Sequence, residues 1–182
     1  MSPHLRVPLS FLVLACAAGL LMGQGDSIED TKPRFGSFLG KQPPEIKAAG
    51  WLNAKKPLTL AEQKGKVVIL DFWSVFCDPC IPGFRRLNEL HAKFGRKGLV
   101  VIGVGREEMG VLGLAAKEHK LAYPVAADDN DATRKAYEVH TMPTCYVIGP
   151  DGKVVWEGTE PEKLKDDQIE KLLSGKARGG KR

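Results

Sequence analysis

The chain has 182 residues, of which 43% are hydrophobic and 27% charged, a composition that is ordinary for a globular protein. Its net charge of +5 lies largely in the tail 175–182, and no basic stripe with interleaved aromatic residues appears elsewhere, so nucleic-acid binding is not expected. Four cysteines are too few for a scaffold built from disulfides, so the core must come from packing. We expect the tail to be a flexible basic end; a loose contact with anionic lipid or nucleic acid is the alternative.

Residues 1–25 have the pattern of a signal peptide. The apolar run 7–22 is short for a membrane span, which needs about 20 apolar residues, and the small residues at 23–25 suit a cleavage site. Residues 13–16 (VLAC) offer a second interpretation, a lipoprotein signal with Cys16 as the lipidated residue, and an uncleaved anchor is the third. All three predict an exported protein, periplasmic or membrane-anchored, that faces an oxidising compartment.

After this signal, the sequence predicts a linker at 26–40 and one folded domain at 41–174. Residues 43–63 carry scattered apolar positions, which indicate short edge structure. Residues 67–73 (VVILDFW) form a nearly continuous apolar, β-branched run, typical of a strand buried on both faces. Residues 80–94 place apolar side chains at helical spacing with polar residues between them.

Strands and helices alternate through the rest of the chain. The predicted elements are a strand at 99–105, a helix at 107–120, a strand at 123–129, a helix at 131–139, strands at 144–148 and 153–156, and a helix at 161–173. The residues GPDG between the last two strands predict a tight turn, and so a hairpin. This order predicts an α/β domain of three layers, with a central mixed sheet flanked by helices.

Cys77 and Cys80 are separated by two residues, where the strand 67–73 is followed by the helix 80–94. The start of a helix has unpaired N–H groups and a partial positive charge, which stabilise a thiolate and lower its pKa below the usual value of about 8.5. The thiolate is the nucleophile in disulfide exchange, and Pro79 suits the first helical turn. The pattern therefore predicts a redox-active pair, with Cys77 at the exposed end.

The pair also has two possible structural interpretations. A structural zinc site needs four ligands, but if Cys16 is removed the chain offers, besides the pair, only Cys145 and its four scattered histidines. A passive structural disulfide is the other alternative. Cys145 lies in an apolar strand, where a free cysteine behaves as a small buried hydrophobe; a third redox thiol is the alternative.

Three stretches together resemble a known family: VVILDFWSVFCDPC (67–80), YPVAADDNDATRKAYEVHTMPT (123–144) and VIGPDGKVV (147–155). They resemble the thioredoxin superfamily and, more narrowly, the TlpA/ResA-like exported thiol-disulfide oxidoreductases, over roughly residues 40–173. The resemblance implies a thioredoxin-like fold and an enzyme that reduces disulfides in partner proteins without a cofactor. Cytochrome c maturation is the typical task of such proteins, and copper-site assembly is another.

The resemblance also assigns roles to residues. Cys77 is the attacking thiol and Cys80 the resolving thiol. Pro143 is the cis-proline, and the backbone of Met142 pairs with the bound substrate. Asp71 is a buried acid that takes the proton of Cys80 when the mixed disulfide resolves.

Phe76 and Trp73 complete the substrate-binding residues that the resemblance implies. The chain also departs from its relatives: Phe76 replaces a common tryptophan, Gly83 replaces a common glutamate, and Asp71 stands where asparagine is usual. Asp78 opposes ionisation of the neighbouring thiol by like-charge repulsion of about 1 kcal/mol. We therefore expect a moderately lowered thiol pKa and a reducing or moderate potential.

Two other functions are alternatives. The first is a copper chaperone on the same fold, with soft Cu(I) ligands at Cys77, Cys80, His140 and Met142. The second is a peroxidase of the peroxiredoxin type, because Ser74 precedes Cys77 by three residues; the proline expected four residues earlier is Leu70 instead. The expected partners are a disulfide-bearing protein and a membrane-bound electron donor, and the protein is expected to be a monomer.

Overall fold

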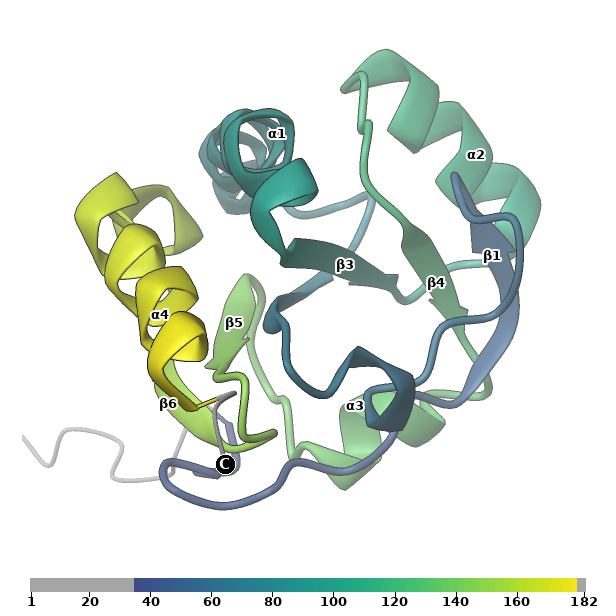
Figure 1. Ribbon diagram of the computed structural model, residues 1–182. Coiled ribbons are helices and arrows are strands. Elements are labelled where there is room, and N and C mark those ends of the chain that lie inside the picture. Colours follow the sequence, from purple (N-terminus) through teal and green to yellow (C-terminus); the bar gives the residue numbers. More distant parts are fainter. Residues whose placement is uncertain (1–34, 180–182) are drawn as a thin grey trace, which may run out of the picture. The chain divides into compact units, whose positions relative to one another are not determined.

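The computed structural model describes residues 35–179, with side chains up to residue 175, so the predicted signal segment and its Cys16 lie outside the described residues. A six-stranded sheet, ordered β1-β4-β3-β2-β5-β6, forms the centre (Figure 1). Its strands are β1 (Ala48–Leu52), β2 (Val67–Trp73), β3 (Leu99–Gly105), β4 (Val125–Asp128), β5 (Thr144–Ile148) and β6 (Val154–Gly158). Strands β2, β3 and β4 run parallel, while β1, β5 and β6 pair antiparallel with their neighbours, so the predicted mixed sheet is confirmed.

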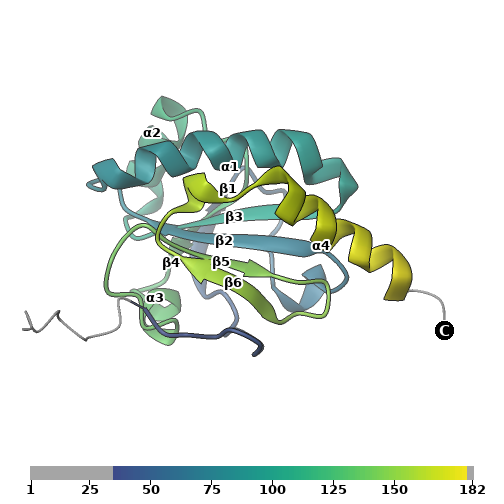
Figure 2. The same ribbon diagram turned by 90° about the vertical axis from the view of Figure 1, so that its left-hand side faces the viewer.

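Four α-helices cover the two faces of this sheet. They are α1 (Ile81–Phe94), α2 (Met109–Glu118), α3 (Ala132–Ala136) and α4 (Asp166–Gly179). Both parallel crossovers, β2-α1-β3 and β3-α2-β4, move in the same direction across the sheet, and right-handed connections therefore place α1 and α2 on one face. Helix α4 packs on that face as well, while α3 lies on the other (Figure 2). No helix within residues 35–179 has the length and apolar character needed to cross a membrane.

Strand β2 is buried along its whole length, as its apolar run predicts. Its side chains alternate between the two faces: Ile69 and Trp73 join the core under α1, and Leu70 and Phe72 join the core over α3. Asp71, between Leu70 and Phe72, therefore points to the α1 face. It lies opposite Gly103 of β3 and Cys145 of β5 in the strand register.

Residues 35–40, which the sequence assigns to the end of a linker, contact the sheet. Leu39 forms a parallel bridge with Val154 of β6, and Phe35 packs edge-on against Tyr146 at 5.8 Å between ring centroids. Tyr146 also donates a hydrogen bond to the Gly36 carbonyl at 2.8 Å. The segment from residue 35 onward therefore packs against the sheet, before the predicted domain boundary at residue 41.

Helix α1 contacts the 3-10 turn η4 (Pro161–Lys163), which precedes α4. A Cβ atom on Gly83 would lie 2.7 Å from Cγ of Pro161, closer than real Cβ contacts. Arg86 holds the same junction, because its Nε donates to the Leu164 carbonyl at 2.8 Å and its Nη2 contacts Asp166 at 2.5 Å. A side chain at position 83 would therefore collide with Pro161.

We predict that Gly83→Ala destabilises the protein despite the higher helix propensity of alanine. Overpacking against Pro161 costs about 1–3 kcal/mol, more than the gain in helix propensity of about 1 kcal/mol. Urea unfolding should show a net loss of about 1 kcal/mol. Gly113→Ala in α2 is the matched control, because a Cβ there meets nothing within 4 Å and should stabilise. A Gly83→Ala protein as stable as that control would contradict the close α1–η4 contact.

Candidate active site

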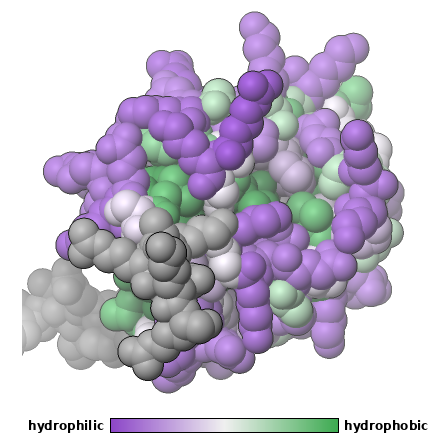
Figure 3. Space-filling model, in the orientation of Figure 1, coloured by the Kyte–Doolittle hydropathy of each residue, from purple (hydrophilic) through white to green (hydrophobic). Residues whose placement is uncertain are grey.

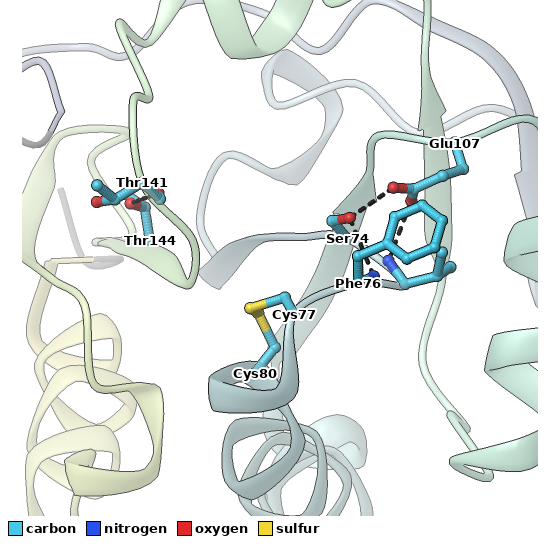
Figure 4. The surroundings of a disulfide bond; sticks show 8 residues. Ser74, Phe76, Cys77, Cys80, Glu107, Thr141 and Thr144 are labelled. Carbon is cyan, nitrogen blue, oxygen red and sulfur yellow. Dashed lines mark hydrogen bonds between the residues drawn. A yellow bond between two sulfur atoms is a disulfide. The ribbon is translucent and has the colours of Figure 1, made fainter.

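A disulfide between Cys77 and Cys80 lies at the start of α1 (Figure 4). Cys77 precedes the 3-10 turn η2 (Asp78–Cys80), which continues directly into α1, and Pro79 occupies the first turn. The Cys80 N–H donates to the Cys77 carbonyl at 2.9 Å. Cys77 is partly exposed, whereas Cys80 is buried at 1% exposure. A partner sulfur can therefore approach Cys77 and not Cys80.

The helix end supplies electrostatic support for a thiolate at Cys77. Cys77 is the N-cap residue of η2, and its side chain makes no capping hydrogen bond. The N–H groups of this first turn and the positive end of the helix dipole therefore lie next to the cysteine pair. Asp78 is exposed at the same end and brings a negative charge into solvent contact. The moderate acidity of Cys77 stays a prediction that follows from these opposing effects.

The loop before β5 faces the disulfide from the other side. Its Met142–Pro143 peptide bond is cis, as the family resemblance implies. The Thr144 hydroxyl donates to the Thr141 carbonyl at 2.7 Å and closes the turn around this bond (Figure 4). Met142 and Cys77 are both partly buried and pack against the same core cluster, while Pro143 is buried. The cis-proline loop and Cys77 therefore border one surface.

Asp71 is a buried carboxyl group beneath this surface. Its burial raises its pKa well above the ordinary value of 3.8, and the nearby negative charge of Glu162 on η4 adds to the effect. Its Oδ1 atom has no hydrogen-bond partner among residues 35–179. Asp71 points to the α1 face of the sheet, the face whose core cluster includes Cys80.

Cys145 lies opposite Asp71 in the register of β2 and β5 and is a free, buried cysteine. Burial raises the pKa of its thiol well above the ordinary value of 9.0, and the charges of Asp71 and Glu162 act in the same direction. The thiol therefore stays protonated at neutral pH and is a poor nucleophile. Its position fits the small buried hydrophobe that the sequence favours.

The two aromatic residues expected to bind substrate, Phe76 and Trp73, differ in solvent exposure. Phe76 is 89% exposed, while Trp73 is fully buried and packs edge-on against Phe84 at 5.1 Å between ring centroids. The large apolar residues exposed in the described part of the chain are Leu39, Phe76, Ile81, Val111, Leu114 and Val155. Hydrophilic residues dominate the face shown in Figure 3, with smaller hydrophobic areas between them. Phe76 is therefore a large exposed apolar side chain next to Cys77, whereas Trp73 lies in the core beneath it.

Glu107 belongs to the site although the sequence pattern did not single it out. Its carboxylate accepts hydrogen bonds from the Ser74 hydroxyl at 2.5 Å and from the Val75 N–H at 3.2 Å. These residues meet because β2 and β3 are parallel neighbours, so the loops that follow them lie at the same edge of the sheet. That rule, applied to the polar residues after each predicted strand, is the signal that points to Glu107.

No group of three or more His, Cys, Asp and Glu side chains within residues 35–179 is placed to hold a metal ion. His140 is exposed, and Cys77 and Cys80 are joined to each other. The set Cys77, Cys80, His140 and Met142 therefore does not form such a group in this disulfide-bonded state.

A closed C-x-x-C disulfide at a helix start, beside a cis-proline loop on a thioredoxin-like sheet, defines the class of thiol-disulfide oxidoreductases. The model of the AhpC/TSA family matches residues 39–157. The chain belongs to this thioredoxin-like family and, more narrowly, to the ResA-like thiol-disulfide oxidoreductases. It is accordingly an enzyme of that class and acts on a disulfide-bearing partner.

Individual relatives and structures agree with this assignment. The thiol-disulfide oxidoreductase ResA of Bacillus thuringiensis subsp. konkukian is 31% identical over 164 residues, which cover 88% of this chain and 91% of the relative. Protein DipZ of Mycobacterium bovis is 33% identical over 120 residues, which cover 61% of this chain but 17% of that protein. A crystal structure described as thiol:disulfide interchange protein DsbE from Chlorobium tepidum matches with a TM-score of 0.65 and 28% identity, covering 72% of this chain and 95% of the other.

We predict that Asp71→Asn changes how stability depends on pH. Below pH 3.8 both folded and unfolded wild type are protonated at Asp71; above it the unfolded state releases the proton while the folded state keeps it. Wild-type stability therefore falls as pH rises toward the raised pKa, by about 1.4 kcal/mol for each unit of the rise, and the asparagine variant lacks this loss.

Urea unfolding between about pH 4 and about pH 8 measures the difference. The stability of Asp71→Asn relative to wild type should grow as pH rises from about 4 and should level off once Asp71 ionises in the folded protein. Asp167→Asn, at an exposed position of α4, is the control and should not show that trend. A constant difference between Asp71→Asn and wild type would show that Asp71 titrates normally in the folded protein.

Proposed function

We propose that the protein is an exported reductase that passes two electrons from a Cys77–Cys80 dithiol to a disulfide in a partner protein. The observation that carries this proposal is the asymmetric pair: Cys77 partly exposed at the helix start, Cys80 buried behind it, and Asp71 in the core on the same face. An accessible nucleophile with a protected resolving thiol suits a two-step exchange.

In the first step the Cys77 thiolate attacks one sulfur of the partner disulfide. A mixed disulfide forms between Cys77 and that sulfur, and the other partner sulfur leaves as a thiolate and takes a proton. In the second step the ionised form of Asp71, which its raised pKa makes a strong proton acceptor, takes the proton of Cys80, and Cys80 attacks the sulfur of Cys77. The second partner sulfur leaves, the Cys77–Cys80 disulfide closes, and the partner has gained two electrons and two protons, one of them passed on from Asp71.

The partner binds across the surface between Phe76 and the cis-proline loop. Phe76 supplies exposed apolar area next to Cys77. Met142 supplies backbone groups for pairing with an extended partner segment, and Pro143 fixes the loop below it. Trp73 is a core support of this surface in our proposal, since it is fully buried.

The signal-like pattern of residues 1–25 supports a location outside the cytoplasm, periplasmic or anchored in the membrane. A reductase in an oxidising compartment needs a supply of electrons, so we propose a membrane-bound donor that reduces the Cys77–Cys80 disulfide again. The resemblance to TlpA/ResA-like proteins favours cytochrome c maturation as the task. We propose that the protein acts as a monomer.

We predict that Cys80→Ser traps the reaction at its first step. The reduced variant should form a stable disulfide between Cys77 and a partner protein, because no second thiol is left to release it. Wild type should reduce insulin disulfides. Cys77→Ser should neither trap a partner protein nor reduce insulin. Cys145→Ser is the matched control and should keep the wild-type rate, since that thiol is buried and protonated. Insulin reduction by Cys77→Ser at the wild-type rate would refute the proposed function.

We further predict a reduction potential closer to the value of about −270 mV typical of thioredoxin than to about −120 mV, typical of a strong oxidant. The helix start stabilises the thiolate, and thereby the reduced form, while the negative charge of Asp78 limits that stabilisation. Equilibration of the pair with glutathione buffers measures the potential. A value near that of the strong oxidant would reverse the proposed direction of electron flow.

A further inference from the structure

We propose that Glu107 is a positioning residue for the exchange reaction. It fixes the segment 74–76, which leads into Cys77 and presents Phe76 to the partner protein. This inference rests on the proposed function and adds to it a residue that lies outside the C-x-x-C motif, the cis-proline loop and the buried acid.

Both carboxylate oxygens of Glu107 are used on this segment. Oε1 accepts from the Ser74 hydroxyl at 2.5 Å, and Oε2 accepts from the Val75 N–H at 3.2 Å. Figure 4 shows Glu107 hydrogen-bonded to Ser74, with Ser74, Phe76 and Glu107 on one side of the disulfide and Thr141 and Thr144 on the other. Hydrogen bonds to an ionised carboxylate are stronger than those between neutral groups, so this contact can hold a short segment of backbone.

Ser74 passes this restraint to the residues beside the disulfide. Its hydroxyl accepts a hydrogen bond from the Phe76 N–H at 3.2 Å while donating to Glu107. Its carbonyl accepts from the Cys77 N–H at 3.1 Å. A continuous chain of hydrogen bonds therefore runs from the Phe76 amide through Ser74 to Glu107, and Ser74 also contacts the backbone of the attacking cysteine.

Val75 and Cys77 pack against the core cluster on either side of Phe76, but packing does not fix Phe76 itself, so its backbone depends on this chain of hydrogen bonds. Phe76 is 89% exposed, so no core contact sets its position. Within residues 35–179, Glu107 is the one side chain from outside the segment that hydrogen-bonds to it. The loop that carries Glu107 is itself short, lying between the end of β3 at Gly105 and the start of α2 at Met109.

Loss of the hydrogen bonds between Glu107 and the segment 74–76 should lower the rate of reduction of protein disulfides more than that of small disulfides. A protein disulfide must lie along both Phe76 and the cis-proline loop while Cys77 attacks, and small displacements of a positioning element lower such rates strongly. A small aromatic disulfide needs only to reach the Cys77 sulfur. The ratio of the two activities therefore separates positioning from general damage to the protein.

The test compares Glu107→Gln, Ser74→Ala and the double variant with wild type. Each single variant should lower kcat/KM for insulin reduction by about tenfold and that for a small aromatic disulfide by about twofold. The double variant should lose no more than either single variant, because both remove the same chain of hydrogen bonds. Ser74→Thr keeps the hydroxyl and should restore most of the activity that Ser74→Ala loses.

Glu108→Gln is the matched control, because Glu108 is the exposed neighbour and its side chain makes no capping hydrogen bond to α2. It should behave as wild type. Full insulin activity in Glu107→Gln would overturn the inference. Equal losses on both disulfides, accompanied by a lower Tm, would also overturn it, since they indicate a purely structural role.

Amide hydrogen exchange tests the same inference without activity, so it stands apart from failure of the proposed function. In Glu107→Gln the Val75 and Phe76 amides should exchange about tenfold faster than in wild type, while the Cys80 amide, bonded to the Cys77 carbonyl, should change less. Unchanged exchange at Val75 and Phe76 would overturn the inference. A wild-type protein inactive on both disulfides would instead count against the proposed function.

Discussion

The complete burial of strand β2 is the constraint on which the rest of the structure depends. All of its residues are buried, with β3 on one side, β5 on the other and helices on both faces. Because the strand has no freedom to slide or turn over, its end delivers Cys77 to the sheet edge at a set distance from the cis-proline loop. The same burial sets Asp71 inside the core on the α1 face. The reactive and the proton-holding groups are thus placed by one packed element.

Burial of Asp71 has a thermodynamic cost that a purely structural strand would avoid. A carboxyl group with a raised pKa and an unpaired oxygen lowers stability at neutral pH, and an apolar residue at that position would not. The cost is understandable if the group exchanges a proton with Cys80. Cys145, opposite in the register, meets the same environment and stays protonated. The same buried environment therefore raises the pKa of the Cys145 thiol and the pKa of the Asp71 carboxyl group.

The chain also rearranges the surroundings of the disulfide relative to its apparent relatives. Pro161 fills the space above Gly83, and the neighbouring Glu162 lies close enough for its charge to act on Asp71. Phe76 provides an exposed apolar ring in place of an indole. On the far side of the segment, Glu107 holds the backbone that carries this ring. Pro161, Phe76 and Glu107 thus surround the cysteine pair with contacts that lie outside the C-x-x-C motif.

The sequence by itself determined the α/β class, the bounds of β2, β3 and β5, and the cysteine pair, because continuous apolar runs and a C-x-x-C spacing are local patterns. Helix ends were less well determined: α2 begins at Met109, two residues later than expected, and the last predicted helix divides into η4 and α4. Only the tertiary structure decided the contact of Glu107 with Ser74, the closure of Gly83 by Pro161, and the contrast between buried Trp73 and exposed Phe76. The physical reason is that each depends on side chains distant in sequence or on the turn after β2, and no local pattern records how those elements pack.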